Sequence, residues 1–508
     1  MNLEKLLKEK FGYATFRTGQ KEIITDLLEG KDVFAMLPTG AGKSLTYLMP
    51  GYVFEGIIVI VSPLLSLMED QVKELKKNGE KRVVAINSFI NKYEKSELLL
   101  NLDKFKFIFL SPETLQNKFI IKQLQQQVIA LFVVDEAHCI SQWGHEFRTD
   151  YLKLGEIKKT LGSPPCLALT ATAPNHVQND IIDQLQIPKA VKHIYNIDRP
   201  NIALHVKRVY DEKDKINELI RFVENLQGPG IIYFSSRKMT EKIAQIIKEE
   251  TNLKVAAYHG GLEQEDRILL QQQFVEGQLD VICCTSAFGM GVNKPDTRFV
   301  IHYHFPGQIE SYVQEIGRAG RDGKESVAIL LYLEEDTHIP KRLVEHEFPS
   351  PEIVDELFNL VSKYSQESKQ LHIEDENEWC EKLQISETMW RFLKFQLERL
   401  SILKGTLIGS IPEQEIFTNS IMKVIHTRKH FKYEKLNEML LFLQTETCLR
   451  QYILAIFNQE MEKKPDNCCT NCIFKEETFF RKQGIEQTHF PFNWKKELHT
   501  IFNQSEIK

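Results

Sequence analysis

The chain has 508 residues, of which 42% are hydrophobic and 26% charged, values usual for a soluble globular protein. Its net charge of −6 excludes a protein that binds nucleic acid through its overall charge, so such binding would need local surfaces. No apolar run approaches the roughly 20 residues of a membrane span, and the first residues lack the apolar stretch of a signal peptide. We therefore expect a cytoplasmic chain of about three or four domains without a membrane partner.

The first strong motif is a glycine-rich turn, LPTGAGKS, at residues 37–44, which lies between a strand-like run at 33–36 and a helix-like segment. Its glycines keep side chains away from backbone N–H groups that can bind phosphates, its lysine adds a positive charge, and its serine offers a hydroxyl to Mg²⁺. The full pattern places glycine at Leu37, so the match is partial, and a turn that binds no nucleotide is the alternative. The predicted nucleotide-binding residues of this turn are Thr39, Gly40, Gly42, Lys43 and Ser44.

A continuous apolar run at 128–134 predicts a strand buried on both faces of a parallel sheet, and Asp135 and Glu136 follow at its carboxyl end. Open α/β sheets bind their ligands at this edge. We expect Asp135 to hold Mg²⁺, usually through water, and Glu136 to orient and deprotonate an attacking water. An ordinary acidic turn is the alternative.

Strand-like and helix-like segments alternate through residues 1–198, which predicts a parallel sheet covered by helices. The alternation restarts in residues 199–348, where no second phosphate loop occurs. Two such units predict an α/β fold with a cleft between them, in which the second unit supplies the far wall.

Residues 349–427 have a different character, because two amphipathic helices precede a short strand pair near 403–407. This order is compatible with a winged helix, although a small helical spacer would have the same pattern.

Residues 428–480 contain a cluster of cysteines, which in a cytosolic chain favours a metal over disulfides. Residues 481–508 form a C-terminal tail.

Taken in order, these motifs make residues 1–345 closely resemble the RecQ family of DNA helicases, within helicase superfamily two. The resemblance implies two tandem RecA-like domains, then the winged-helix-like segment and a zinc-binding helical subdomain. It also implies a DNA-stimulated ATP hydrolase that moves 3′ to 5′ on single-stranded DNA and unwinds duplex DNA in repair or recombination. The implied partners are single-stranded DNA, duplex DNA and repair or recombination proteins, and the implied location is the nucleoid. The chain looks like a short bacterial-type relative.

The segment near the start resembles the family's adenine-recognition motif. The resemblance implies that the Gln20 amide satisfies the donor and acceptor edges of adenine, while Tyr13 and Arg17 offer faces for stacking. Thr18 stands where proline is common in the family. The alternative is that Tyr13 and Phe16 are core residues beneath the first helix.

Several segments resemble the family's nucleic-acid contacts. Residues 62–68 and 110–115 resemble segments that grip one strand through its phosphates, and 169–173 resembles the motif that links hydrolysis to strand movement. Capped helix starts are the alternative for the first two. Residues 138–148 resemble the aromatic-rich loop of RecQ proteins, and inward-packed rings are the alternative there. The side chains expected to stack on bases or to pair with phosphate are Trp143, His145, Phe147 and Arg148.

In the second unit, residues 314–323 resemble the superfamily's arginine-bearing motif. Arg318 and Arg321 share a helix face, and one of them can act as an arginine finger on the transferred phosphoryl group. Residues 287–296 match the fifth motif, with Asn293 where aspartate is frequent. The residues to which we assign catalytic roles are Lys43, Asp135, Glu136, Gln314, Arg318 and Arg321.

The late cysteines resemble the RecQ zinc-binding subdomain, in which one helical cysteine joins a tight cluster. Four thiolates suit a closed tetrahedral Zn²⁺ site, and the expected ligands are Cys448, Cys468, Cys469 and Cys472. The usual C-x-x-C-x-x-C spacing would place a cysteine at Asp466, which is the alternative fourth ligand. Free cysteines without zinc are the other alternative.

Two rival functions share the same core motifs. The first is an RNA helicase, or a translocase that moves along a strand without separating duplexes. The second is an ATP-gated nucleic-acid clamp with little turnover, although the presence of Lys43, Glu136 and Arg321 argues against it.

Overall fold

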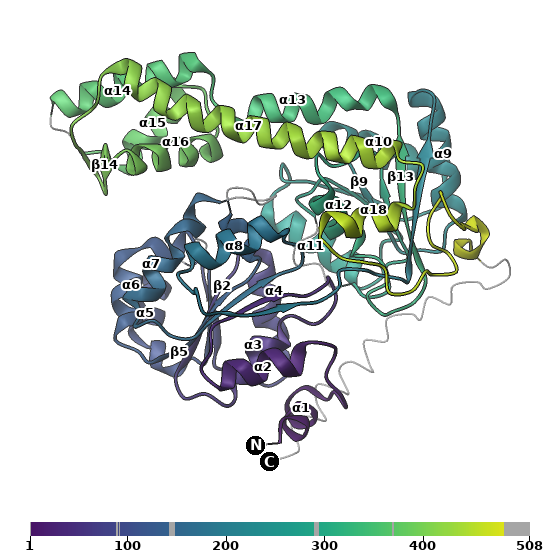
Figure 1. Ribbon diagram of the computed structural model, residues 1–508, viewed down its shortest axis with the longest axis horizontal. Coiled ribbons are helices and arrows are strands. Elements are labelled where there is room, and N and C mark those ends of the chain that lie inside the picture. Colours follow the sequence, from purple (N-terminus) through teal and green to yellow (C-terminus); the bar gives the residue numbers. More distant parts are fainter. Residues whose placement is uncertain are drawn as a thin grey trace.

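The computed structural model describes residues 2–63, 65–87, 90, 92–141, 148–288, 294–367 and 370–481. Two α/β domains lie side by side, and a helical lobe lies beside the first of them (Figure 1). We call residues 349–427 the lobe and residues 428–480 the cysteine subdomain. Within the described residues, no helix is both long enough and apolar enough to cross a membrane.

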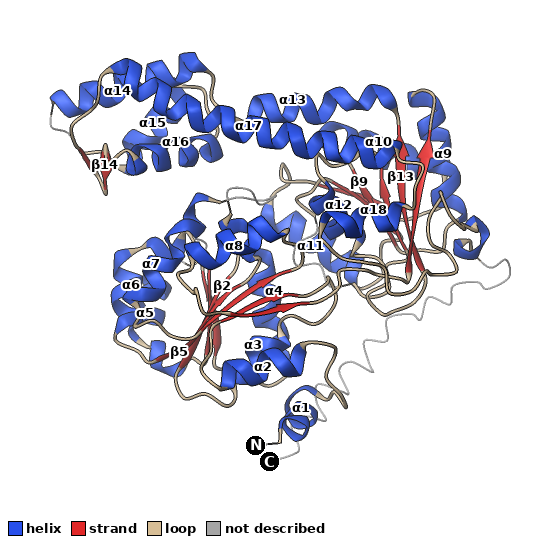
Figure 2. Cartoon of the chain, viewed as in Figure 1, coloured by secondary structure: helices blue, strands red, loops and turns tan. Residues whose placement is uncertain are grey.

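The first domain contains a seven-stranded parallel sheet with the order β3–β4–β2–β5–β6–β1–β7 (Figure 2). Its strands are β1 (Val33–Met36), β2 (Ile57–Val61), β3 (Val83–Ile86), β4 (Phe107–Leu110), β5 (Ile129–Val134), β6 (Cys166–Thr170) and β7 (Val191–Ile194). Its helices are α1 (Leu3–Phe11), α2 (Gln20–Leu28), α3 (Leu45–Gly51), α4 (Leu65–Lys77), α5 (Lys92–Leu100), α6 (Lys118–Gln125), α7 (Leu154–Thr160) and α8 (Asn175–Gln184).

Alternate residues of the strands face opposite sides of this sheet, as the two-residue period of a strand requires. Phe34 and Met36 pack in the core with residues of α6, α7 and α8, whereas Val33 and Ala35 pack with residues of α2, α3 and α4. Helices therefore cover both faces, which explains why β1, β2 and β4 are continuous apolar runs.

The second domain contains a six-stranded parallel sheet with the order β10–β11–β9–β12–β13–β8. Its strands are β8 (Ile202–Arg208), β9 (Gly230–Tyr233), β10 (Val255–Tyr258), β11 (Val281–Cys284), β12 (Phe299–His302) and β13 (Ser326–Tyr332). Its helices are α9 (Glu212–Asn225), α10 (Arg237–Glu250), α11 (Gln264–Val275), α12 (Ile309–Ile316) and α13 (His338–Glu347). Two parallel-sheet domains in tandem confirm the predicted α/β fold.

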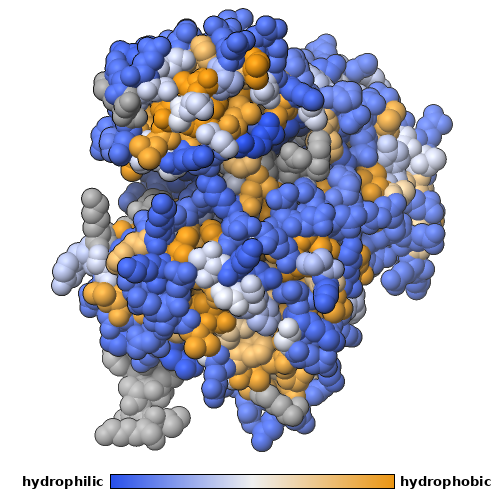
Figure 3. All heavy atoms as spheres, turned by 60° about the vertical axis from the view of Figure 1, so that its left-hand side comes forward, coloured by the Kyte–Doolittle hydropathy of each residue, from blue (hydrophilic) through white to orange (hydrophobic). Residues whose placement is uncertain are grey.

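The lobe has its own apolar core, to which Val354, Trp379 and Leu393 contribute. Its elements are α14 (Pro351–Gln366), α15 (Ile373–Lys382), α16 (Glu387–Arg399), β14 (Leu403–Lys404) and β15 (Leu407–Ile408). In the space-filling view of Figure 3, hydrophilic side chains cover most of the visible face, and apolar side chains gather in patches on the lobe and on the first domain.

A single long helix, α17 (Gln414–Gln444), runs from the lobe to the second domain (Figure 1). The expected boundary between residues 427 and 428 lies inside α17, so one helix belongs to both the lobe and the cysteine subdomain. A shorter helix, α18 (Leu449–Ile456), follows and packs beside it. The helical C-terminal region predicted from the sequence is therefore confirmed.

Candidate active site and metal centre

A cavity of about 800 Å³ lies between the two α/β domains, and both domains line it. All residues predicted for adenine, phosphate, Mg²⁺ or hydrolysis line this cavity, namely Tyr13, Arg17, Gln20, Thr39, Gly40, Gly42, Lys43, Ser44, Asp135, Glu136, Gln314, Arg318 and Arg321. Folding therefore brings together three groups of residues that the sequence keeps far apart.

The phosphate loop connects β1 to α3 and forms one wall of the cavity. Gly40 and Gly42 have φ angles of 87° and 75°, in the left-handed region that favours glycine. A Cβ at Gly40 would lie 3.3 Å from Cγ of Arg321, so the second domain approaches this loop closely. The Lys43 Nζ lies 3.6 Å from Oε1 of Glu136, which places the lysine charge beside the acidic pair.

Asp135 and Glu136 follow β5, and the fold orients both. The backbone N–H of Asp135 donates to the Val61 carbonyl (2.9 Å), and the Asp135 carbonyl accepts from the Tyr151 hydroxyl (3.2 Å). The Asp135 carboxylate accepts the N–H of Glu136 at 3.0 Å. Burial, reinforced by the charge of Glu136, raises the pKa of Asp135 to about 6, and Lys43 opposes this increase only partly. A bound cation would stabilise its charged form.

Glu136 also belongs to a polar chain that the sequence did not indicate. Its Oε2 lies 3.4 Å from Nδ1 of His138, and this nitrogen lies 3.0 Å from Oγ1 of Thr170. The Thr170 hydroxyl donates to the Thr172 carbonyl at 3.1 Å. His138 therefore lies beside the Glu136 carboxylate and is hydrogen-bonded to segment 169–173, for which only the family resemblance suggested a link to hydrolysis.

The opposite wall of the cavity comes from the second domain, where Gln314 lies on α12 and two arginines follow it. Arg318 is 6% exposed. Burial, together with the charges of Arg318 and Arg199, lowers the pKa of Arg321 to about 9. A cluster of buried positive charge facing a phosphate loop has the electrostatic character of an anion site, because an anion would relieve the repulsion.

Arg199 is a residue of this region that the sequence indicated only as part of a domain boundary. Its Nη1 donates to the carbonyls of Thr39 (2.8 Å) and Gly317 (3.1 Å), and its Nη2 donates to those of Ala319 (3.1 Å) and Gly320 (2.7 Å). One guanidinium therefore joins the phosphate loop to the arginine-bearing segment. No short motif could have revealed this contact.

The adenine segment contacts the phosphate loop directly. The Gln20 Nε2 donates to the carbonyls of Ala41 (2.9 Å) and Gly42 (3.1 Å), and its Oε1 accepts the N–H of Arg17 (2.9 Å). Tyr13 is 58% exposed and is not a core residue. In this conformation the Gln20 amide is already hydrogen-bonded at both ends, so adenine recognition requires it to exchange these partners.

The segments predicted to contact nucleic acid come together around Arg148. Its Nη1 donates to the Pro63 carbonyl (2.8 Å) and lies 3.7 Å from Oε1 of Glu113. Arg391 of α16 lies 3.3 Å from the same oxygen, so the lobe contacts the first domain here. Ser111 accepts the N–H of Thr114 (3.2 Å), as a simple turn cap would. Three predicted base-stacking residues lie outside the described residues, namely Trp143, His145 and Phe147.

One group among the described residues has the composition and spacing to hold a metal ion, and it consists of Cys448, Cys468, Cys469 and Cys472. Their sulfurs lie within 4.8 Å of one another, with 3.7 Å between Sγ of Cys448 and Cys468 and 3.9 Å between those of Cys448 and Cys469. Zn–S bonds of about 2.3 Å in a tetrahedron put the sulfurs about 3.8 Å apart. These thiols therefore fit zinc, and Asp466 is exposed outside the group.

The comparisons with known proteins agree with this geometry. Residues 17–181 match the DEAD/DEAH box helicase family, residues 214–323 the helicase conserved C-terminal domain, and residues 413–473 the RecQ zinc-binding family. Over 504 residues the chain is 44% identical to a Bacillus subtilis protein named probable ATP-dependent DNA helicase RecS, which covers 99% of this chain and 98% of that protein. The chain belongs to the RecQ family of ATP-dependent DNA helicases.

Other RecQ relatives match a smaller part of this chain. The ATP-dependent DNA helicase RecQ of Haemophilus influenzae is 40% identical over 329 residues, which are 64% of this chain and 52% of that protein. A protein of Acanthamoeba polyphaga mimivirus, named a putative ATP-dependent RNA helicase, is 40% identical over 67% of this chain and 62% of its own length.

Solved structures also resemble this RecQ member. Mycobacterium smegmatis helicase Lhr, bound to single-stranded DNA and AMP-PNP, has a TM-score of 0.56 at 18% identity, covering 82% of this chain and 61% of that chain. DEAD-box helicase Mss116, bound to single-stranded RNA, has a TM-score of 0.55 at 18% identity, covering 82% and 94%. At these identities the likeness shows the fold alone.

Proposed function

We propose that this protein hydrolyses ATP in the cleft between its two α/β domains in order to move 3′ to 5′ along single-stranded DNA and to separate duplex DNA. The observation that carries the proposal is the shared cavity, in which a phosphate loop and an acidic pair on one domain face Arg318 and Arg321 on the other. Such a cleft can couple the hydrolysis of a nucleotide to the relative movement of two domains.

In this mechanism the first domain holds the nucleotide. The phosphate-loop amides and Lys43 bind the β and γ phosphates. Ser44 and Asp135 are the residues that would hold Mg²⁺, and both line the cavity. When bound, Mg²⁺ would neutralise charge that develops on the phosphates. The raised pKa of Asp135 supports this role, because a buried carboxylate near a second carboxylate is stabilised by a cation.

Glu136 orients the attacking water and accepts its proton, and His138 and Lys43 lie beside the Glu136 carboxylate. Gln314, Arg318 and Arg321 approach from the second domain and stabilise the charge of the transferred phosphoryl group. Because these donors belong to the second domain, hydrolysis requires a closed cleft.

On the DNA side, segments 62–68 and 110–115 together with Arg148 bind the phosphates of one strand, and Trp143, His145 and Phe147 stack on its bases. The four cysteines hold a structural Zn²⁺ ion. We place the protein in the cytoplasm at the nucleoid, where it would act with repair or recombination proteins.

The test is strand separation with ATP and Mg²⁺ on a 3′-tailed DNA duplex, beside a 5′-tailed duplex, an RNA duplex and the Lys43→Ala variant. Opening of the 3′-tailed DNA alone, with no opening by Lys43→Ala, is the expected result. Opening of the 5′-tailed duplex alone would overturn the polarity, and ATPase activity retained by Lys43→Ala would overturn the site assignment.

A second candidate is an RNA helicase, or a translocase that does not separate strands. One observation favours keeping it, namely the mimivirus relative that carries the name of an RNA helicase. If single-stranded RNA stimulates ATP hydrolysis more than single-stranded DNA does, the result would support an RNA helicase. ATP hydrolysis without opening of any duplex would support a translocase. Slow hydrolysis that DNA does not change would instead support an ATP-gated clamp.

A further inference from the structure

The segment that joins the two α/β domains, residues 195–202, is held from outside by the cysteine subdomain. Gln459, which follows α18, donates through Nε2 to the Tyr195 carbonyl (3.1 Å) and accepts the N–H of Ile197 through Oε1 (2.9 Å). A single amide side chain thus binds two backbone groups of the linker, in the manner of a neighbouring strand.

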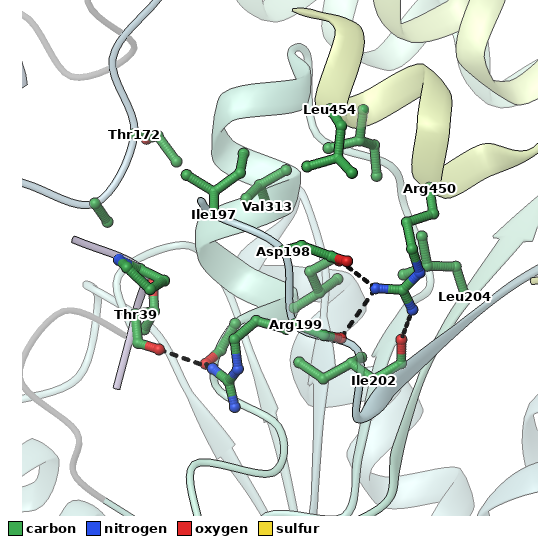
Figure 4. Close-up of a pocket in the computed structure, with 15 residues that line it drawn as sticks. Thr39, Thr172, Ile197, Asp198, Arg199, Ile202, Leu204, Val313, Arg450 and Leu454 are labelled. Carbon is green, nitrogen blue, oxygen red and sulfur yellow. Dashed lines mark hydrogen bonds and ion pairs between the residues drawn. The ribbon is translucent and has the colours of Figure 1, made fainter. Parts of the chain in front are cut away.

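Arg450 of α18 holds the next part of the same linker. Its Nη1 donates to the Asp198 carboxylate and to the Arg199 carbonyl (3.0 Å), and its Nη2 donates to the Ile202 carbonyl (Figure 4). Arg450 is 3% exposed. Charge-assisted bonds made by a buried, planar guanidinium fix both the position and the orientation of the backbone that they bind.

The linker residue between these contacts is Arg199, whose side chain points toward Thr39 (Figure 4). As described above, its guanidinium joins the phosphate loop to the carbonyls of residues 317–320. The backbone of Arg199 is therefore held by the cysteine subdomain, while its side chain connects the two walls of the nucleotide cavity.

Apolar packing supports the same arrangement. Ile197 of the linker, Val313 of α12 and Leu454 of α18 line one small cavity, of about 40 Å³, between the two domains and the subdomain (Figure 4). These contacts belong to a single core cluster that also includes three of the four cysteines. Close-packed side chains transmit displacement, so a shift of α18 would move the linker.

The cysteine cluster lies between the start of α18 and the second domain. Cys448 is the N-cap residue of α18. The Cys468 carbonyl accepts the N–H of Leu204 on β8 (3.1 Å), and the N–H of Thr470 donates to the Leu204 carbonyl (3.0 Å). The group of four thiols thus lies between the N-cap of α18 and β8, the edge strand into which the linker leads.

We propose that Arg199 is a positioning residue of the nucleotide site and that Arg450 and Gln459 hold it there, so that the cysteine subdomain sets the catalytic competence of the cleft. The inference rests on the proposed nucleotide site. Arg199 binds carbonyls on both sides of the cleft, so its loss should misplace the segment that carries Arg318 and Arg321. The chemical step depends on the segment with Arg318 and Arg321 more strongly than nucleotide binding to the first domain does.

The expected signature is therefore a fall in kcat without a matching rise in KM. Arg199→Gln should lower the kcat of ATP hydrolysis about 10- to 100-fold, because small misplacements of catalytic groups are this costly. The KM for ATP should change less than about threefold, because the interactions lost act mainly in the transition state. Arg450→Gln should lower kcat in the same direction, and Arg450→Lys, which keeps the charge beside Asp198, should restore part of it.

The experiment measures DNA-stimulated ATP hydrolysis and zinc content in the full chain for Arg199→Gln, Arg450→Gln, their combination and Gln459→Ala. The matched control is Arg221→Gln. Arg221 also joins the C-terminal segment to the second domain, through Glu476 (2.5 Å), but its contact lies on α9 and not on the linker. The control should keep the wild-type kcat.

Because Arg450 acts through Arg199, the double variant should be no slower than Arg199→Gln alone, with zinc content unchanged. A double variant whose kcat falls by the product of the two single reductions would overturn the proposal, and so would a wild-type kcat in Arg450→Gln. If Arg450→Gln loses zinc or fails to fold, Gln459→Ala decides, because its contacts lie away from the cysteines, and a wild-type kcat there overturns the proposal. A wild-type chain that hydrolyses no ATP would refute the proposed function itself, and this inference with it.

Discussion

Asp135→Asn should stabilise the ligand-free protein while it removes Mg²⁺-dependent hydrolysis. Asp135 is buried beside Glu136, and its pKa is raised from 3.8 to about 6. An acid whose pKa is higher in the folded state than in the unfolded state makes the protein less stable as the pH rises from the lower value through the higher. At pH 7 the wild-type protein therefore carries the full cost of this buried charge. Asparagine has no charge, yet its oxygen can still accept the N–H of Glu136.

The size of the effect follows from the two pKa values. At pH 7 the cost to the wild type is up to about 3 kcal/mol, and at pH 5 it falls to roughly half of that. A gain of about 3 kcal/mol raises the melting temperature of a domain of this size by roughly 6–12 °C. The advantage of the variant should therefore shrink by about half between pH 7 and pH 5.

The assay is thermal unfolding of the ligand-free wild type and Asp135→Asn at both pH values, following the transition of the first domain, with Asp103→Asn as an exposed control in that domain. Addition of ATP and Mg²⁺ should stabilise the wild type more than the variant. A variant that melts at or below the wild-type temperature at pH 7, or whose advantage does not change with pH, would refute the reasoning.

Three further expectations follow from individual contacts. Cys469→Ser should lose zinc and lower the melting temperature, whereas Cys380→Ser should keep zinc because Cys380 lies outside the metal group; equal zinc content in both, by elemental analysis, would contradict the assignment. Gln20→Ala should reduce the preference for ATP over GTP, measured as the ratio of their kcat/KM values, by about 10-fold or more, because the site loses the amide that would hydrogen-bond to the edge of adenine. An unchanged ratio would favour a purely structural role for the hydrogen bonds of Gln20 to the phosphate loop. Arg391→Ala should change stability by less than about 1 kcal/mol, because the Arg391 side chain is 45% exposed; denaturant unfolding with a larger loss would show that the lobe depends on this ion pair.

Most of the fold could be predicted from the sequence because strands buried on both faces have continuous apolar sequences, as in β2 and β4. The sequence did not predict β3, β7 or β8, all of which lie at the edge of a sheet. In β7, residues Val191–Ile194 alternate between half-buried and exposed positions. Local motifs also predicted the phosphate loop and the acidic pair, because their chemistry depends on residues close together in the chain.

Contacts that depend on three-dimensional proximity could not be predicted in this way. Arg199 binds backbone carbonyls, which every residue has, so no residue type at positions 39 or 317–320 indicates the contact. Likewise, the adjacent Cys468 and Cys469 departed from the family spacing and left the fourth ligand open. In the structure both sulfurs join the group, so the unusual spacing still places four thiols around one centre.

The lobe has an unequal attachment to the two domains, and this difference has a mechanical consequence. Helix α17, which the lobe shares with the cysteine subdomain, packs against α12 and α13 of the second domain. In the part of α17 that belongs to the cysteine subdomain, Lys435 pairs with Glu310 at 2.8 Å, and both side chains are mostly buried. The lobe's contacts with the first domain include two ion pairs of partly exposed side chains, between Arg391 and Glu113 and between Lys153 and Glu398. Exposed pairs contribute little free energy. Opening of the nucleotide cleft would therefore carry the lobe away with the second domain, break its contact beside Arg148, and change access to the predicted strand-binding segments in each cycle.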